Sequence, residues 1–118
     1  MEDTSVDISG LQNEIATFAS ERDWEKFHTV KNLVLALLGE AGELASVVQW
    51  LEKVDKEFLD SNKEVRQDLA DELADVFIYL IRIADVSGID ILKAAQEKMQ
   101  KNSDRYTVEK SFGNAEKQ

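Results

Sequence analysis

Residues 32–51 read NLVLALLGEAGELASVVQWL, a nearly continuous apolar run with two glutamates, Glu40 and Glu43, at its centre. The apolar residues follow helical rather than alternating spacing, which predicts a helix. A carboxylate inside apolar surroundings is costly unless a positive charge meets it. A second helical run repeats the pattern with Glu72 and Asp75. Two such pairs, each spaced i and i+3, would place four carboxylates where two helices face each other, as in a bundle that holds divalent metal.

The alternative is that these acids belong to solvated helix faces, as charge runs usually do. That alternative is reasonable for Glu72 and Asp75, because Asp68 and Asp71 extend the acidic strip. It suits Glu40 and Glu43 poorly, since their surroundings leave little polar face for them to join. Those surroundings are Leu37, Leu38, Ala41, Leu44 and Ala45.

Length and composition predict a single all-α domain. The chain has 118 residues, 43% of them hydrophobic, with five Gly and no Pro. That size suits one domain, residues 1–118 with an ordered core of about 8–106, and the helical spacing of its apolar residues excludes a sheet. The absence of Cys removes disulfide and thiol chemistry.

Charge and the start of the chain bear on partners and compartment. Residues 1–92 carry eight Lys and Arg against twenty Asp and Glu, so no nucleic-acid partner is expected. Glu40 and Glu43 interrupt the apolar run from Leu33 to Leu51, so no membrane span is expected either. The start, Met1 to Thr4, is acidic and polar rather than basic and apolar, which favours the cytoplasm.

Hydrophobic periodicity and end signals predict four helices. A helix over 8–22 has a possible capping box at Ser9, and residues 23–28 form an aromatic connector. A helix over 29–53 begins at Thr29 and is apolar on several sides, which predicts contact with a second subunit. After a connection at 54–62, Ser61 caps a helix that Gly88 ends, with a core face at Val65, Leu69, Leu73, Val76, Leu80 and Ile83. Asp90 caps the last helix, over 91–102, with Ile91, Leu92, Ala95 and Met99 buried, before a loosely ordered tail from Tyr106.

The donor types indicate which metal the acidic pairs would bind. Carboxylates without Cys or suitably spaced His favour Mg²⁺ or Mn²⁺ over zinc. A diiron bundle needs Glu-x-x-His twice, whereas His28 is alone and distant in sequence. Because Mg²⁺ usually takes further ligands from substrate phosphates, nucleotide hydrolysis is a natural function for such a site.

Three segments together resemble a known family. They are ERDWEKFHTVKNLVLALLGEAGELASVVQW at 21–50, DELADVFIYL at 71–80 and KMQKNSDRY at 98–106. Their order and spacing resemble those of the all-α nucleoside triphosphate pyrophosphatases of the MazG-like group, and most of all the dCTP pyrophosphatases. The resemblance covers about residues 11–113. It implies a four-helix MazG-like bundle that pairs with a second subunit, as a homodimer or homotetramer.

The resemblance implies Mg²⁺-dependent hydrolysis of a nucleoside triphosphate to the monophosphate and pyrophosphate, in nucleotide pool housecleaning. Glu40, Glu43, Glu72 and Asp75 would be the catalytic metal ligands, and either Glu43 or Glu72 would act as the base. Lys98 and Arg105 would offset charge on the phosphate oxygens. The implied substrate is dCTP or a related or modified pyrimidine deoxynucleotide.

Six further positions match those that shape the nucleotide pocket in the resembling proteins: Trp24, His28, Asn32, Trp50, Asn102 and Tyr106. Aromatic rings stack on bases, and Asn offers a donor and an acceptor. Each position except Asn32 also has an ordinary structural explanation. Trp50 would be core, Trp24 a connector, His28 a capping residue, Asn102 a helix end and Tyr106 a surface anchor.

Two departures bear on the substrate. Thr107 stands where many relatives have Pro after the Arg-Tyr pair, and residues 54–62 lack the Gly and Pro of some dCTP pyrophosphatases. Both departures bear on which base is preferred more than on the reaction itself. A substrate with another base, such as dUTP, therefore remains an alternative. A non-catalytic helical dimerisation module is the alternative from another class, supported by the surplus apolar surface of residues 29–53.

Overall fold

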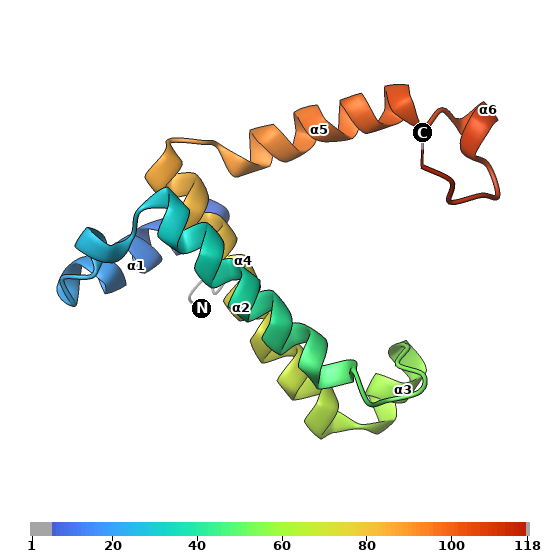
Figure 1. Ribbon diagram of the computed structural model, residues 1–118, viewed down its shortest axis with the longest axis horizontal. Coiled ribbons are helices and arrows are strands. Elements are labelled where there is room, and N and C mark those ends of the chain that lie inside the picture. The colour runs from blue at the N-terminus through green and yellow to red at the C-terminus, as the bar shows by residue number, and fades with distance from the viewer. Residues whose placement is uncertain (1–5, 118) are drawn as a thin grey trace, which may run out of the picture. The chain divides into compact units, whose positions relative to one another are not determined.

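The structure is a computed structural model that describes residues 6–117, so the polar start Met1 to Thr4 lies outside it. All regular secondary structure among the described residues is helical (Figure 1), which confirms the all-α class. The elements are α1 (Ile8–Glu21), a 3-10 helix η1 (Glu25–Phe27), α2 (Val30–Val48), α3 (Lys56–Ser61), α4 (Lys63–Ser87), α5 (Ile91–Arg105) and α6 (Val108–Ser111). The chain forms two compact units, one through Ser87 and one from Gly88.

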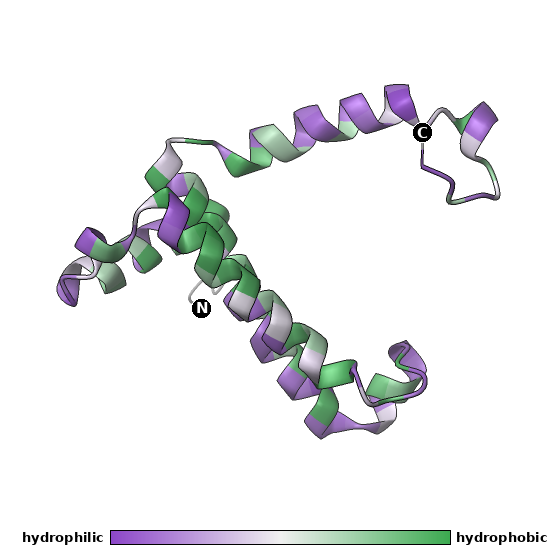
Figure 2. Cartoon of the chain, in the orientation of Figure 1, coloured by the Kyte–Doolittle hydropathy of each residue, from purple (hydrophilic) through white to green (hydrophobic). Residues whose placement is uncertain are grey.

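Helices α2 and α4 form the centre of the N-terminal unit. They run antiparallel, side by side, with α3 at the turn between them (Figure 1). Helix α1 packs on α4, and apolar residues concentrate where the start of α2 and the end of α4 meet (Figure 2). Leu33, Ile81, Ala84 and Ala19 are buried there. This end of the pair anchors the fold, because burying a branched aliphatic side chain contributes about 1.5–3 kcal/mol.

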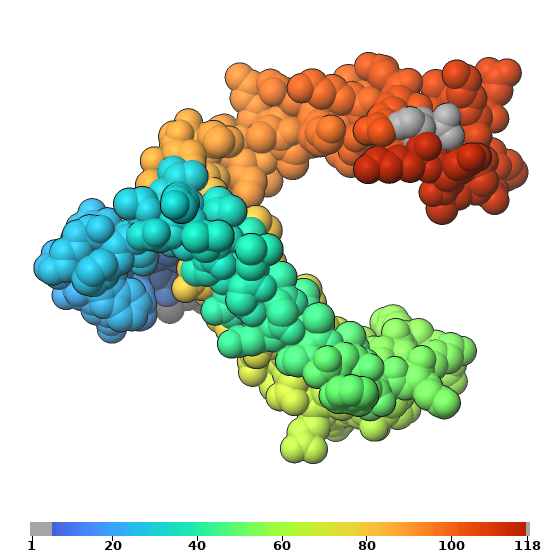
Figure 3. Space-filling view, in the orientation of Figure 1, coloured from blue at the N-terminus to red at the C-terminus, as the bar shows by residue number. Residues whose placement is uncertain are grey.

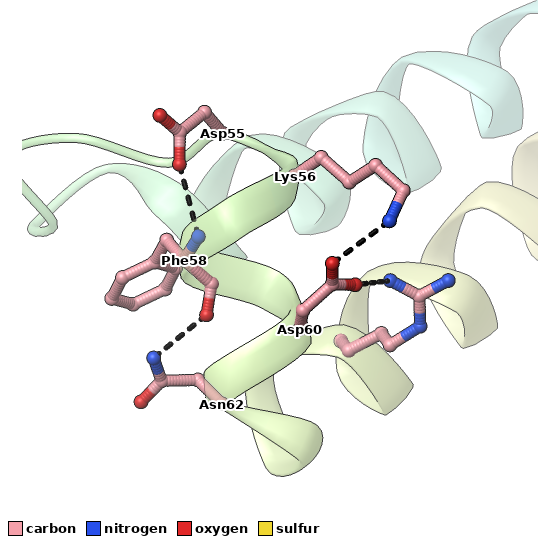
Figure 4. Close-up of polar contacts among 6 residues, drawn as sticks. Asp55, Lys56, Phe58, Asp60 and Asn62 are labelled. Carbon is pink, nitrogen blue, oxygen red and sulfur yellow. Dashed lines mark hydrogen bonds and ion pairs between the residues drawn. The ribbon is translucent and has the colours of Figure 1, made fainter.

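Helix α3 was not expected, since residues 54–62 were predicted to be a connection. Its residues make four local polar contacts (Figure 4). Asp55 Oδ1 accepts from the Phe58 N–H at 2.9 Å, and Asn62 Nδ2 donates to the Phe58 carbonyl at 2.8 Å. Asp60 pairs with Lys56 at 2.8 Å and with Arg66 of α4 at 3.3 Å. An N-cap and i,i+4 pairing therefore turn a polar stretch into a short helix that packs on α4.

Several predicted helix ends were wrong. Helix α1 is capped by Asp7, whose Oδ1 accepts from the Gly10 N–H, rather than by Ser9. Helix α2 ends at Val48, five residues before Lys53, with Gln49 as its C-cap, and Asp55 caps the next helix. Helix α4 begins at Lys63, where Asn62 rather than Ser61 precedes the first turn. Helix α5 continues to Arg105 instead of ending at Asn102, and the tail after Tyr106 contains α6.

The predicted caps at Thr29, Asp90 and Gly88 were confirmed. Thr29 Oγ1 accepts from the Asn32 N–H, and Asp90 Oδ1 accepts from the Lys93 N–H, each at 3.1 Å. Gly88 follows α4 with φ of +70°. That left-handed conformation ends a helix and suits glycine, because a Cβ there crowds the following carbonyl.

Parts of the predicted core are exposed. Leu73 and Leu80 of α4 are exposed, while Arg82 between Ile81 and Ile83 is buried. In α5, Leu92 and Met99 are exposed, although they were predicted to be buried. Periodicity places Leu73 and Leu80 on one face of α4, and Leu92 and Met99 on one face of α5, but neither unit by itself covers these residues.

No helix of residues 6–117 combines the length and the hydropathy that crossing a membrane requires.

Replacing Gly88 tests the left-handed end of α4. We expect Gly88→Ala to lower the free energy of unfolding by about 1–2 kcal/mol, because a Cβ strains this backbone. Gly88→Asn is the matched control and should lose less, since Asn tolerates the left-handed region. Urea unfolding followed by circular dichroism measures both. Equal midpoints for wild type and Gly88→Ala would contradict the assignment.

Candidate metal centre and adjoining cavity

Four carboxylates converge across the α2–α4 pair. Glu40 and Glu43 project from α2, and Glu72 and Asp75 project from α4. One oxygen atom from each side chain lies within 4.8 Å of the others. The two i,i+3 spacings produce this meeting, because each places both acids on the same side of its helix and the helices lie side by side.

The four side chains differ in burial. Glu40 and Glu72 are half-buried, and the Oε2 atom of each is buried without a hydrogen-bond partner. Glu43 and Asp75 are exposed, so the expectation that both glutamates of α2 are enclosed by apolar residues was wrong for Glu43. A buried carboxylate oxygen without a donor is destabilising, because it has lost its hydration and gained nothing in return. These two atoms therefore require an external partner.

The electrostatics of the cluster point the same way. Burial raises the pKa of Glu40, and repulsion from Glu43 and Asp75 raises it further. Burial likewise raises the pKa of Glu72, followed by repulsion from Glu43 and Asp75. None of the ion pairs found among residues 6–117 includes any of the four carboxylates. The cluster is thus a concentration of negative charge without a protein cation to balance it.

The donor set fits a hard divalent cation. It consists only of carboxylate oxygens, which Mg²⁺ and Mn²⁺ prefer, and contains neither Cys nor His. Ligands about 2.0–2.1 Å from Mg²⁺ lie at most about 4 Å apart, close to the spacing found here. The two unpartnered oxygens of Glu40 and Glu72 would gain the partner they lack.

A cavity of about 270 Å³ adjoins this cluster through Asp75. It lies between α1, η1 and the α2–α4 pair. The residues around it are Ile15, Phe18, Ala19, Trp24, His28, Leu33, Asp75, Ile78, Tyr79 and Arg82. Because Asp75 belongs to both features, a molecule with an apolar ring in the cavity could place a charged group beside the carboxylates.

The aromatic connector shapes one wall of the cavity. The Trp24 ring lies edge-on to Phe18 at 5.6 Å between centroids, and edge-on to His28 at 6.5 Å. Asp23 precedes Trp24 in a left-handed conformation, with φ of +54°, and so turns the chain sharply after α1. This turn brings Trp24 and His28 to the cavity, as two of the predicted pocket residues.

The other predicted pocket residues do not line this cavity. Asn32 donates its side-chain amide to the Phe27 carbonyl at 3.1 Å and so fastens η1 to the start of α2. Trp50 is 88% exposed just after α2. Lys98, Asn102 and Arg105 lie on α5, and Tyr106 is its C-cap, all within the unit that begins at Gly88. Their roles in a site stay predictions.

Sequence reasoning missed Tyr79 and Arg82 as cavity residues. Both were detectable in principle, because they follow Asp75 by four and seven residues and so share its face of α4. Arg82 was overlooked because an arginine within an apolar helical stripe is ordinarily expected to reach solvent.

Comparisons with known proteins agree with this arrangement. The family model described as the MazG nucleotide pyrophosphohydrolase domain matches residues 28–108. The chain is 43% identical to dCTP pyrophosphatase 1 of Rattus norvegicus over 114 residues, which is 97% of this chain and 65% of the relative. It is 43% identical to dCTP pyrophosphatase 1 of Homo sapiens over 105 residues, 89% of this chain and 60% of the relative. The chain thus spans less than two thirds of the length of these two curated relatives.

A solved structure is also similar. The crystal structure of a pyrophosphatase from Archaeoglobus fulgidus matches 91% of this chain and 98% of its own, with 33% identity and a TM-score of 0.76.

The raised pKa values predict how stability depends on pH when metal is removed. A carboxyl whose pKa is raised by folding stabilises the folded state at low pH, and this contribution is lost as pH rises through the raised value. With chelator present, the contribution of Glu40 and Glu72 to the free energy of unfolding should therefore fall as pH rises above the usual carboxyl pKa of 4.5. Excess Mg²⁺ should restore the lost stability, by about 2.7 kcal/mol at a hundred times Kd.

Glu40→Gln tests whether repulsion within this cluster, rather than among the acids in general, destabilises the fold. It should be more stable than wild type in chelator at neutral pH, and its melting temperature should respond less to Mg²⁺. Asp68→Asn is the control, because it removes one negative charge from α4 outside the cluster. Thermal unfolding of all three proteins, with chelator and with Mg²⁺, checks the prediction. An equal Mg²⁺ response in Glu40→Gln and wild type would overturn it.

Proposed function

Since this chain belongs to the MazG nucleotide pyrophosphohydrolase family, we propose that it hydrolyses a nucleoside triphosphate to the monophosphate and pyrophosphate. The proposed substrate is dCTP or a related pyrimidine deoxynucleotide, in keeping with the names of the curated relatives. One observation carries the proposal. The four-carboxylate cluster and the aromatic-lined cavity share Asp75, which supports a site that activates phosphate beside a site that binds a flat ring.

Glu40, Glu43, Glu72 and Asp75 would hold Mg²⁺ or Mn²⁺. When bound, the metal polarises the triphosphate and lowers the pKa of a water that attacks the α-phosphorus. Either Glu43 or Glu72 would accept the proton of that water, since a carboxylate is a suitable base beside a coordinated water. The four carboxylates would thereby position the reacting groups, and positioning supplies much of the rate enhancement in phosphoryl transfer.

The cavity would bind the nucleobase. Its size suits a small ring, and Trp24, His28 and Tyr79 offer ring faces and hydrogen-bonding atoms at its wall. The apolar residues Leu33 and Ile78 exclude water from the rest of the wall. The family resemblance assigns Lys98 and Arg105 to the phosphate oxygens, and Asn102 and Tyr106 to the nucleotide, and these four roles stay predictions.

A panel of deoxynucleoside and ribonucleoside triphosphates, assayed for pyrophosphate release, tests this function. We expect Mg²⁺-dependent release, greatest for dCTP, that stops with chelator. Glu43→Gln should reduce kcat/KM at least about 100-fold, because loss of a metal ligand removes several kcal/mol of transition-state stabilisation. Asp68→Asn should retain the wild-type rate, since it lies outside the cluster.

The outcomes of this panel are distinct. Preference for dUTP would keep the reaction and change the base. Failure to release pyrophosphate from any triphosphate would overturn the function and favour the non-catalytic dimerisation module.

The exposed apolar face of α2 supports a homo-oligomer. Val30, Val34, Leu35 and Leu38 are exposed apolar residues on this helix, and Leu38 is 67% exposed. Figure 3 shows α2 uncovered on the face toward the viewer. An apolar face of this kind on a soluble chain usually marks a protein contact. A second copy is the proposed occupant, because the same helix carries the metal ligands and a symmetric contact would hold both copies of it in place.

Leu38→Glu tests the contact. A charge at this exposed apolar position should convert the oligomer to monomer, because a desolvated, unpaired carboxylate would be buried in the interface. Size-exclusion chromatography with light scattering measures the mass. Val6→Glu makes the same exchange at an exposed apolar residue before α1 and should leave the mass unchanged. A monomeric wild type, or an unchanged mass in Leu38→Glu, would contradict the proposal.

A further inference from the structure

Arg82 is the one charged residue that is buried among the described residues, and it lies at the cavity. The residue is 7% exposed. A buried guanidinium is strongly destabilising unless its donors are paired. Both of its recorded partners are in the same unit: Nε donates to His28 Nδ1 at 3.0 Å, and Nη1 lies 3.4 Å from Asp85 Oδ2.

A second link extends this chain of contacts to α1. Asp85 Oδ1 accepts a hydrogen bond from Gln12 Nε2 at 3.1 Å. Gln12 belongs to α1, Asp85 and Arg82 to α4, and His28 is the C-cap of η1. The four side chains therefore tie three elements together behind the cavity. Such a network restricts the rotamers of its members, so His28 is held rather than free to rotate.

The contact with Arg82 determines the tautomer of His28. A guanidinium has only donors and keeps its charge at any ordinary pH. The Nδ1 atom of His28 must therefore accept, which leaves its proton on Nε2. Burial lowers the pKa of His28, and the positive charge of Arg82 lowers it further, against a smaller opposing effect of Glu25. The neutral imidazole is thus favoured at neutral pH.

We propose that Arg82 is a positioning residue that holds His28 as the Nε2–H tautomer, so that His28 donates a hydrogen bond to an acceptor atom of the nucleobase in the cavity. The proposal rests on the proposed function for the identity of the ligand. It gives the cavity a fixed donor beside the Trp24 ring, and a fixed donor rejects a base that presents a donor at the same point. The charged and titratable groups near the imidazole are Arg82, Glu25, Asp85, Asp75 and Tyr79.

His28 is the only histidine in the chain, which makes the tautomer directly measurable. The ¹⁵N spectrum of the imidazole in wild-type protein should show one protonated nitrogen, Nε2, and one unprotonated nitrogen, Nδ1. Arg82→Met should shift both signals toward the average of two tautomers. Arg66→Met is the matched control, because it removes an arginine from the exposed surface of the same helix. A wild-type spectrum with Nδ1–H, or one unchanged by Arg82→Met, would overturn the proposal.

Asp85→Asn provides a second variant in case Arg82→Met does not fold. It keeps the shape of the side chain but removes the charge that holds Arg82, so the two ring signals should move part of the way toward the average. Circular dichroism establishes that each variant is folded. If Arg82→Met unfolds, an unchanged spectrum in Asp85→Asn counts against the network.

Binding is tested with dCMP, which requires no hydrolysis. Addition of dCMP to wild type should shift the Nε2 signal of His28, because an acceptor atom of the base would accept a hydrogen bond from the Nε2–H group. No shift at saturating dCMP would overturn the assignment of the acceptor. Since this measurement does not depend on pyrophosphate release, failure of the tautomer and failure of the proposed reaction are distinguishable.

Kinetics separate positioning from a purely structural role. Arg82→Met should raise KM for dCTP about 5- to 10-fold with little change in kcat, as expected when a uniform binding interaction is lost. His28→Gln should keep most of the affinity, since its amide nitrogen reaches about as far as Nε2, whereas His28→Asn reaches only as far as Nδ1. The reverse order of these two variants would contradict the proposal.

Discussion

Repulsion among four carboxylates is the constraint around which the N-terminal unit is built. Glu40, Glu43, Glu72 and Asp75 meet where α2 and α4 lie side by side, and two of their oxygens are buried without partners. Packing must therefore hold together a helix pair that its own charges push apart. Leu33 and Ile81 provide that packing where α2 begins and α4 ends, and Leu33 also lines the cavity that Asp75 shares with the acids. The packing that stabilises the helix pair therefore adjoins the candidate site, because a site that stores unfavourable charge needs support from its surroundings.

The helices were predictable because their signals are local. The apolar periodicity, the Thr29 and Asp90 caps and the left-handed Gly88 each depend on a few neighbouring residues, and each was correct. The end of α2 and the existence of α3 were not predicted, because the local Asp55 cap and the Lys56–Asp60 pair lie in a stretch without an apolar periodic pattern, and a contact with α4 adds to them. Asp60 pairs with Arg66 of α4 across six residues, which a reading of residues 54–62 alone does not reveal.

The carboxylate cluster was easier to predict than the cavity for a physical reason. Acids spaced i and i+3 in apolar runs are recognisable from sequence, because placing carboxylates in apolar surroundings is destabilising unless a ligand binds them. The cavity instead depends on how α1 and η1 approach α4. Its least expected residue, Arg82, takes its role from partners 54 and 3 residues away in sequence, His28 and Asp85. Asn32 was assigned to a ligand from its type and position. Its side-chain amide donates to the Phe27 carbonyl, which a local pattern does not reveal, and its role at a ligand stays a prediction.

The distribution of charge also orders the events of the proposed reaction. A triphosphate is strongly anionic, and it would approach a chain of net charge −10 at a point where four carboxylates gather. At ordinary ionic strength such a cluster repels an anion within about 8–10 Å. The carboxylates must therefore be neutralised by cations before, or together with, the arrival of the phosphates. The cavity carries no such barrier, because its wall is mostly apolar and its polar residues include Asp75, Tyr79 and the paired side chains of His28 and Arg82. In the proposed reaction, recognition of the base and activation of the phosphate would thus be controlled by different forces, and Asp75 is the residue that the cavity and the cluster share.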